Sequence, residues 1–271
     1  GASVYRDGRW YSYTRRQGLG ADWVAALAVD PAQRVWFGTF GGGLSRLDTA
    51  ESALPQADRW HTYTVANSDL PGDWISALAV DAQGRLAVGT WGRGVAILDA
   101  AKPALPTGER WQTYSTANSP LPDDYVTSLA AAADGSLWVG LHGHGLARLH
   151  EGRWTLIDSR SRLPDDFVSA LAAAPDGSLW VGTAKGLVQF DASGRLQRVY
   201  LEADGLPDDR IVSLAADAGG RLWVGTARGA TLLENGVWTT YRGAGTLAHD
   251  YVSALAATSE GAWFGSMTAG V

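Results

Sequence analysis

The 271-residue chain has no cysteine and a single methionine. Its apolar runs are all much shorter than the roughly 20 residues that a membrane helix needs. The missing cysteine excludes a disulfide framework and any thiolate metal site. A net charge of −6, from 22 basic and 28 acidic residues, argues against a general nucleic-acid-binding protein, whose surface is normally basic. The first residues, Gly1 to Val4, show neither an initiator methionine nor a signal sequence, so we expect a mature or excised domain.

Glycine and tryptophan are abundant instead, with 34 and 13 residues, and both recur at regular spacing. Six versions of one short apolar segment lie near residues 34–38, 85–89, 136–140, 178–182, 221–225 and 261–265. Their closing glycines are 51, 51, 42, 43 and 40 residues apart. Each version follows an apolar stretch and precedes a glycine-rich turn and a short strand, and an aromatic strand comes next in most copies. Four short strands per unit of this length are typical of a propeller blade.

The repeats predict an all-β fold, a six-bladed β-propeller with four antiparallel strands per blade, forming one domain over residues 1–271. A blade is covered on both faces, so its inner strand can be continuously apolar, as residues 75–80 are. We expect residues 3–6 and the strand that begins at Arg9 to complete the last blade, which would take two strands from each terminus and remove the open sheet edge. A closed ring of this kind is expected to be a monomer.

The motif Leu-Pro-Asp-Asp followed by Leu-Trp-Val-Gly-Thr gives the repeat a family likeness. It is clearest in residues 163–168 with 179–183, and in residues 206–209 with 222–226. It resembles the two-component regulator propeller repeat of the sensor regions of bacterial hybrid histidine kinases. The resemblance implies a sensor-type propeller that detects ligands, often oligosaccharides, and an extracytoplasmic location, either periplasmic or secreted.

Repetition separates residues of the architecture from candidate site residues, because a residue type that recurs in every blade is expected to pack the core. Equivalent inner-strand positions hold Leu27, Leu78, Leu129, Leu171, Leu214 and Leu255. Ten tryptophans recur on second and outer strands and are expected to pack between blades: Trp36, Trp138, Trp180, Trp223 and Trp263, and Trp10, Trp60, Trp111, Trp154 and Trp238.

The residues that depart from the repeat are expected around one mouth of the central channel. At the start of the inner strands stand Trp23, Trp74, Tyr125, Phe167, Arg210 and Tyr251, and in the loops between second and third strands stand Phe40, Trp91, His142, Lys185 and Arg228. The collar is either a hydrophobic plug or a binding platform for sugar rings or another flat ligand. Because aromatic side chains fill the early blades and cations the later ones, we favour a ligand with a flat face and an anionic group.

The recurring aspartates receive a structural interpretation. Pairs at 123–124, 165–166 and 208–209, with single aspartates at 22, 73 and 250, are expected to accept backbone N–H bonds where a loop turns into the inner strand. A carboxylate ring that binds a cation or forms an acid/base pair is the alternative. His142 and His144 have the spacing of two metal ligands, but no third ligand stands nearby, so we expect no metal and no cofactor. No catalytic motif is recognisable, and no catalytic residue is assigned.

The sequence therefore predicts a non-enzymatic propeller that senses or binds a small molecule or oligosaccharide. It predicts no nucleic-acid partner and contains no membrane segment. The long loops 48–58 and 99–109 are expected to pack locally, with docking of a protein partner as the alternative. Three other functions stay open: a protein–protein interaction scaffold, a structural or engineered ring without its own ligand, and a glycan hydrolase or lyase.

Overall fold

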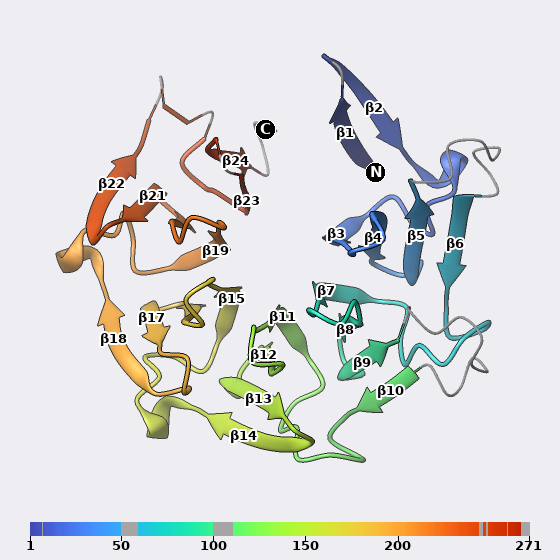
Figure 1. Ribbon diagram of the computed structural model, residues 1–271, viewed down its shortest axis with the longest axis horizontal. Helices are drawn as coiled ribbons and strands as arrows, with labels where there is room; N and C mark the ends of the chain where they lie inside the picture. Colours follow the sequence, from blue (N-terminus) through green and yellow to red (C-terminus); the bar gives the residue numbers. More distant parts are fainter. Residues whose placement is uncertain are drawn as a thin grey trace. The chain divides into compact units, whose positions relative to one another are not determined.

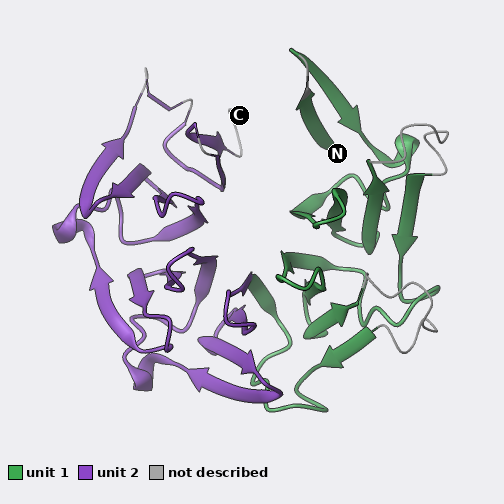
Figure 2. Cartoon of the chain, in the orientation of Figure 1, with its two compact units in different colours: residues 1–129 green, residues 130–271 purple. Residues whose placement is uncertain are grey.

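The computed structural model describes residues 1–6, 8–49, 59–99, 111–243, 246–247, 249–258 and 260–266. The chain divides into two compact units, unit 1 (residues 1–129) and unit 2 (residues 130–271), and each is described by itself (Figure 2). The regular structure of these residues is β-strand, apart from three short 3-10 turns: η1 (Arg15–Gln17), η3 (Ser159–Ser161) and η4 (Glu202–Asp204). The all-β expectation is confirmed, whereas the assignment of the whole chain to one domain stays a prediction.

Unit 1 contains two four-stranded antiparallel sheets and one hairpin (Figure 1). The hairpin pairs β1 (Ala2–Arg6) with β2 (Arg9–Tyr13). The first sheet runs β3 (Val24–Val29), β4 (Arg34–Thr39), β5 (Leu44–Asp48) and β6 (Trp60–Tyr63). The second runs β7 (Ile75–Val80), β8 (Leu86–Thr90), β9 (Val95–Leu98) and β10 (Trp111–Tyr114). Consecutive strands are hydrogen-bonded neighbours in each sheet, as in a β-meander.

Unit 2 repeats the same pattern. One sheet joins β11 (Val126–Ala131), which spans the boundary of the units, to β12 (Leu137–Leu141), β13 (Leu146–His150) and β14 (Arg153–Ile157). The next is β15 (Val168–Ala173), β16 (Leu179–Thr183), β17 (Gly186–Phe190) and β18 (Leu196–Tyr200). The third is β19 (Ile211–Ala216), β20 (Leu222–Thr226), β21 (Gly229–Glu234) and β22 (Val237–Tyr241), and β23 (Ala254–Ala257) pairs with β24 (Ala262–Gly265).

The repeat was located correctly, since each of the six predicted second strands overlaps β4, β8, β12, β16, β20 or β24 to within one or two residues. The inner strand 75–80 is β7. The blade count is not confirmed, because the described residues form seven sheets rather than six. Closure of a last blade by both ends of the chain is not confirmed either, because the two hairpins β1–β2 and β23–β24 are separate sheets.

The glycine that closes each second strand is required by the packing of neighbouring sheets. A Cβ atom on Gly38 would lie 2.5 Å from Cγ2 of Ile75, the first residue of β7. In unit 2, a Cβ on Gly182 would lie 2.5 Å from Cγ2 of Ile211, the first residue of β19. The β-branched side chain of the next inner strand therefore fills the space above the glycine, which explains why this glycine recurs.

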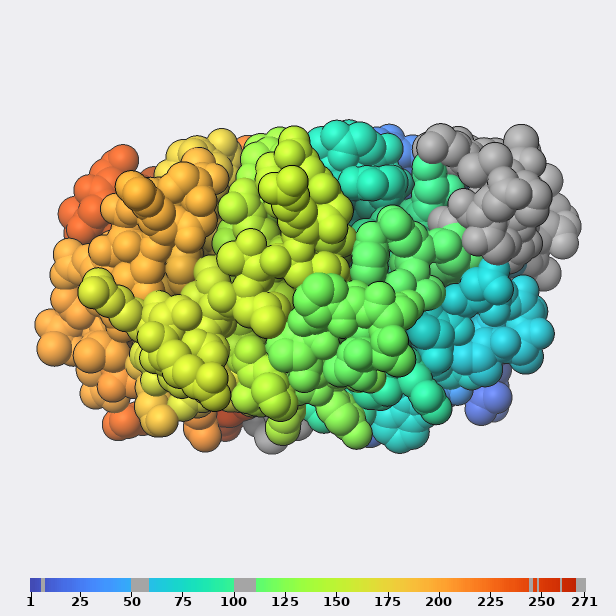
Figure 3. All heavy atoms as spheres, turned by 90° about the horizontal axis from the view of Figure 1, so that it is seen from below, coloured from blue at the N-terminus to red at the C-terminus, as the bar shows by residue number. Residues whose placement is uncertain are grey.

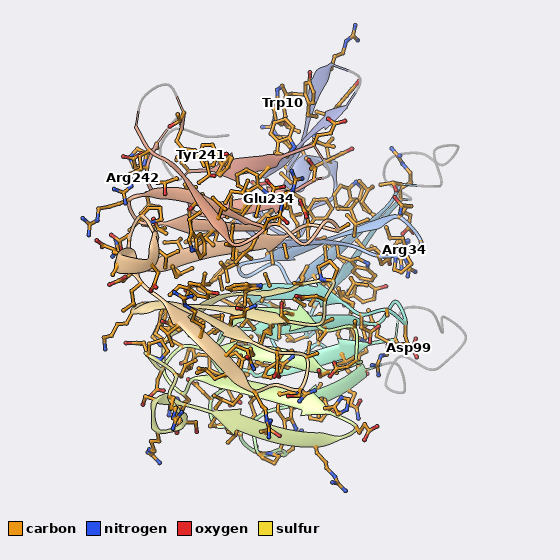
Figure 4. All side chains as sticks on the ribbon, turned by 60° about the vertical axis from the view of Figure 1, so that its left-hand side comes forward. Trp10, Arg34, Asp99, Glu234, Tyr241 and Arg242 are labelled. Atoms are coloured by element: carbon orange, nitrogen blue, oxygen red, sulfur yellow. The ribbon has the colours of Figure 1, made fainter. Side chains whose placement is uncertain are left out.

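Five tryptophans of the complete sheets pack as predicted, since Trp36, Trp111, Trp138, Trp180 and Trp223 are buried. The other three, Trp60, Trp154 and Trp238, are half-buried. Two tryptophans of the terminal hairpins were predicted wrongly as packing residues. Trp10 on β2 is 58% exposed and Trp263 on β24 is 50% exposed, and Trp10 stands on its hairpin in Figure 4. A two-stranded sheet offers less surface to cover a ring. Leu27 is likewise 59% exposed, because β3 has no fully buried residue and half-buried residues alternate with exposed ones.

Side chains fill the spaces that the ribbon leaves between neighbouring sheets. In unit 2, Trp180 and Leu187 pack with Ile211, Leu222 and Val224, which joins the sheet of β16 to the sheet of β20. Figure 3 shows the outer surface of this unit in yellow-green to orange. The described part of the chain contains no helix long and apolar enough to span a membrane.

Candidate functional site

Five aromatic side chains of unit 1, called the aromatic row, form two groups of contacting rings that a backbone hydrogen bond joins: Trp23, Phe40 and Trp74 in one, and Trp91 and Tyr125 in the other. Trp23 stacks on Phe40, with ring centroids 5.1 Å apart and an interplanar angle of 27°. Phe40 meets Trp74 edge to face at 5.5 Å, and Trp91 meets Tyr125 edge to face at 5.3 Å. All five residues belong to the predicted collar, so the structure brings this part of the prediction together.

Backbone hydrogen bonds hold the aromatic row in place. The turn after the second strand carries Phe40 in one sheet and Trp91 in the next. The N–H of Phe40 donates to the carbonyl of Trp23, and the N–H of Trp91 donates to that of Trp74, both at 2.9 Å. Phe40 also forms a β-bridge with Trp74, and Trp91 forms one with Tyr125. The rings therefore stand on a rigid framework rather than on loose loops.

The aromatic row is open to solvent. Trp23 is 69% exposed, Trp74 55%, Tyr125 46% and Trp91 37%. Four large aromatic side chains exposed next to one another are unusual, because isolated exposed apolar residues are common but contiguous patches mark interaction surfaces. A flat apolar face or sugar ring laid on these rings would bury part of this area.

The aspartates at the start of the inner strands are structural. The carboxylates of Asp22, Asp73, Asp124, Asp166, Asp209 and Asp250 each accept a backbone N–H from the preceding loop, at 2.6 to 2.9 Å. The first aspartate of a pair makes a second bond, as when Asp165 accepts the N–H of Phe167 and Asp208 that of Arg210, both at 2.8 Å. This bonding confirms the predicted role of the carboxylates in turning the loop.

The loop cations of unit 2 are paired within the chain. Nζ of Lys185 lies 2.8 Å from Oδ2 of Asp165. Nε of Arg228 lies 2.5 Å from Oδ2 of Asp208, and its Nη2 lies 3.1 Å from Oε1 of Glu202. The hydrogen bond to Asp165 and its charge raise the pKa of Lys185 above its usual value. The binding of an acidic ligand by these cations stays a prediction, and in the unliganded chain their charge is already matched.

These ion pairs also lower the pKa values of the carboxylates. Burial on its own would raise the pKa of Asp208, but the hydrogen bonds from Arg228 and from the Arg210 backbone, with both positive charges, outweigh it. The pKa of Asp208 therefore lies below its usual value of 3.8. The same balance of burial against Lys185 and the Phe167 N–H lowers the pKa of Asp165.

The remaining predicted residues of unit 2 are less closely grouped. His142 meets Phe167 edge to face, with ring centroids 5.2 Å apart. Arg210 is exposed and directly precedes the inner strand β19, while Nδ1 of His249 accepts the N–H of Tyr251 at 3.0 Å. Across the described residues, no three His, Asp or Glu side chains gather in a way that could hold a metal ion. Most of the long loops 48–58 and 99–109 lies outside the described residues, so their packing or docking role stays a prediction.

Sequence reasoning missed one residue of the turn that carries Trp91. Arg93 occupies the position of Lys185 and Arg228, since a threonine hydroxyl at the end of the second strand accepts its N–H at 3.2 Å, as it does for the other two. Arg93 is exposed and forms no ion pair with the described residues. The signal that could have found it is Gly72, which stands two residues before Trp74 where Asp208 stands two before Arg210.

Comparison with known proteins agrees with this repeat. Residues 120–143, 162–185 and 205–228 match the two component regulator propeller family. These three segments, of 24 residues each, resemble the two-component regulator propeller repeat. Each matched segment runs from the loop before an inner strand to the turn after a second strand. Two of these repeats contain the Asp165–Lys185 and Asp208–Arg228 pairs, which end at the last residue of the match. No curated protein matches the chain.

Solved structures resemble the whole array of repeats. The extracellular domain of a hybrid two component system from B. thetaiotaomicron is 20% identical, with a TM-score of 0.74 over 96% of this chain and 33% of its own. Virginiamycin B lyase from Staphylococcus aureus, solved with quinupristin, is 17% identical, with a TM-score of 0.71 over 97% and 83%. A gluconolactonase from Xanthomonas campestris is 17% identical, with a TM-score of 0.54 over 86% and 79%. These likenesses show the β-propeller fold alone, and the chain spans about a third of the two-component-system domain.

Proposed function

We propose that the chain is a non-catalytic sensing domain that binds an oligosaccharide, or another ligand with flat apolar faces, on the aromatic row. The observation that supports this most is the exposure of Trp23 and Trp74, at 69% and 55%, beside ring partners fixed by backbone bonds. A hydrophobic plug would bury these rings. A chain of sugar rings, in contrast, would cover successive members of the row.

Binding without catalysis is supported by the use of the repeated carboxylates. Asp73 and Asp124, the aspartates next to Trp74 and Tyr125, accept backbone N–H groups at 2.9 and 2.8 Å. A carboxylate engaged in this way orders a loop. The lyase and the gluconolactonase share the fold with this chain, and a fold hosts both catalysis and binding.

The repeat family and the extracellular domain of the two component system also support a sensing role, with an extracytoplasmic location for this domain. In this proposal the paired cations of unit 2 stabilise the repeat and do not bind the ligand. The ligand therefore binds to unit 1, on the aromatic row.

The proposal is tested by replacing Trp74 and Trp91 together with alanine and titrating the protein with neutral and acidic oligosaccharides, followed by tryptophan fluorescence. We expect saturable binding by the wild type and an about 100-fold loss in the double variant, since each stacked ring contributes roughly the 1.4 kcal/mol of a tenfold change. Trp10→Ala is the matched control, because Trp10 is an exposed tryptophan of unit 1 outside the row. Equal affinities for the double variant and the wild type would refute the site.

A further inference from the structure

The loop cation of the second complete sheet of unit 1 lacks the acidic partners that its counterparts in unit 2 possess. Arg228 is flanked by Asp208 and Glu202. The equivalent of Asp208 before Trp74 is Gly72. The equivalent of Glu202 is Val65, because the N–H groups of both residues donate to the same aspartate of the repeat, Asp209 or Asp73. Both acidic positions around Arg93 are therefore occupied by residues without charge.

The stem of Arg93 lies directly over this missing carboxylate. A Cβ built on Gly72 would lie 2.9 Å from Cγ of Arg93 and 3.3 Å from its Cβ. Val65 is 52% exposed and carries no charge. The pairing seen at Asp208 is thus absent here, in a turn that is one residue longer: the hydroxyl of Thr90 donates to the carbonyl of Gly94, four residues on, whereas that of Thr226 donates to Gly229, three residues on.

The described carboxylates of the loop before β7 and of the residue pair before β11 form no ion pair with Arg93. Asp73 accepts the N–H of Val65, and Asp124 accepts the N–H and hydroxyl of Thr116 at 2.8 and 2.9 Å. Asp69 is exposed and makes no ion pair with a described residue. The guanidinium of Arg93 consequently keeps its hydrogen-bond donors available to a ligand.

Arg93 is also part of the turn that carries the aromatic row. Trp91 stands two residues before it, and the N–H groups of Gly92 and Gly94 on either side donate to the carbonyl of Asp124 at 3.0 and 2.9 Å. The planar fork of an arginine next to exposed rings matches a sugar that carries a carboxylate, because the rings stack on the sugar face and the fork binds both carboxylate oxygens.

We propose that Arg93 is a specificity-determining residue that selects a carboxylate-bearing oligosaccharide, a uronate, on the aromatic row. This inference rests on the proposed binding function of that row. Among the described turns between second and third strands, three carry the cations Arg93, Lys185 and Arg228. The acidic group of the ligand is assigned to Arg93, because Gly72 and Val65 replace its acidic partners.

The test compares trigalacturonate with its methyl ester, which keeps the sugar faces but removes the charge. We expect calorimetric titration of the wild type to give about 10-fold or greater preference for the acid. Arg93→Ala should abolish the preference without changing the affinity for the ester. Arg160→Ala, which removes an equally charged and 93% exposed side chain of unit 2, should keep it.

The outcomes separate the two proposals. Equal binding of acid and ester by the wild type, with both lost in the Trp74 and Trp91 double variant, would overturn the role of Arg93 and leave the binding function standing. A preference that survives in Arg93→Ala would overturn it as well. Failure of both ligands to bind would contradict the proposed function and, with it, the assignment of Arg93.

Discussion

Unit 1 and unit 2 are built from the same four-stranded sheet. The same aspartate caps the loop before the inner strand, and a threonine holds the turn after the second strand in every complete sheet except that of β12, which ends in Leu141. They differ in what surrounds the cation of that turn. In unit 2, Lys185 and Arg228 each face a carboxylate at 2.8 or 2.5 Å. In unit 1, Arg93 faces a glycine beside a row of exposed aromatic rings.

The difference shows how a repeat can be turned into a site. An acid and a cation at fixed positions of one repeat neutralise each other, which lowers the pKa of Asp165 and Asp208 and ties the loop before the inner strand to the turn after the second strand. Where the acid is replaced by Gly72, the threonine still holds the turn and the cation is left without the carboxylate of the repeat. Two kinds of variant therefore test the comparison: those that change the packing shared by the units, and those that change the ion pairs in which the units differ.

The shared packing predicts the largest effect on stability. Gly38→Ala and Gly182→Ala each place a Cβ about 2.5 Å from a stiff isoleucine of the next sheet, Ile75 or Ile211, so we expect each to reduce the free energy of unfolding by about 1–3 kcal/mol. Denaturant titration measures this loss. Gly143→Ala is the control, since its Cβ would meet no atom within 4 Å. If either variant is as stable as the control, the two units do not share this packing.

The paired carboxylates predict a smaller, pH-dependent effect. Asp208→Asn should lower the melting temperature by about 1–3 °C at pH 7, because the partner Arg228 is largely exposed and screened by solvent. The pKa of Asp208 is lowered by folding, so its contribution is complete above the unfolded pKa of about 3.9 and is lost as the pH falls through the lower folded value.

Melting curves between pH 7 and pH 2 measure this contribution. The difference between wild type and Asp208→Asn should vanish at the acidic end, while Asp69→Asn in unit 1 should show no difference at any pH, since Asp69 makes no ion pair with a described residue. A difference that grows with acid would contradict the assignment of the ion pair.

Much of the fold could be predicted from the sequence. The repeated glycine and tryptophan mark the second strand of each unit, and the position of the second strand fixes those of the other three strands of the sheet. The buried Trp36 and Trp180 follow from that register. The exposed Trp10 and Trp263 fit the same sequence pattern. The burial of a tryptophan depends on which side chains pack against its ring, and the repeat does not show what packs against the hairpins at the two ends of the chain.

The candidate site was half predicted. The aromatic residues stood out because each departs from the repeat by its own side chain. Lys185 and Arg228 looked available for the same reason, but the availability of a charge depends on a second residue about 20 positions earlier, and both have one in Asp165 and Asp208. Arg93 was missed because its distinguishing feature is the absence of that partner at Gly72.

The most direct test of the central claim is to restore in unit 1 the acid that unit 2 has, and to compare Gly72→Asp with Gly72→Asn. The new Cβ crowds the flexible stem of Arg93 and lies at an ordinary contact distance of 3.9 Å from Cβ of Thr90, so both variants should fold. Calorimetric titration with trigalacturonate and its methyl ester should give a ratio of affinities near 1 for the Asp variant, because the new carboxylate occupies Arg93, and a ratio of about 10 or more for the Asn variant. An Asp variant that still prefers the acid as strongly as the Asn variant would contradict the claim that the missing carboxylate is what makes Arg93 a binding residue.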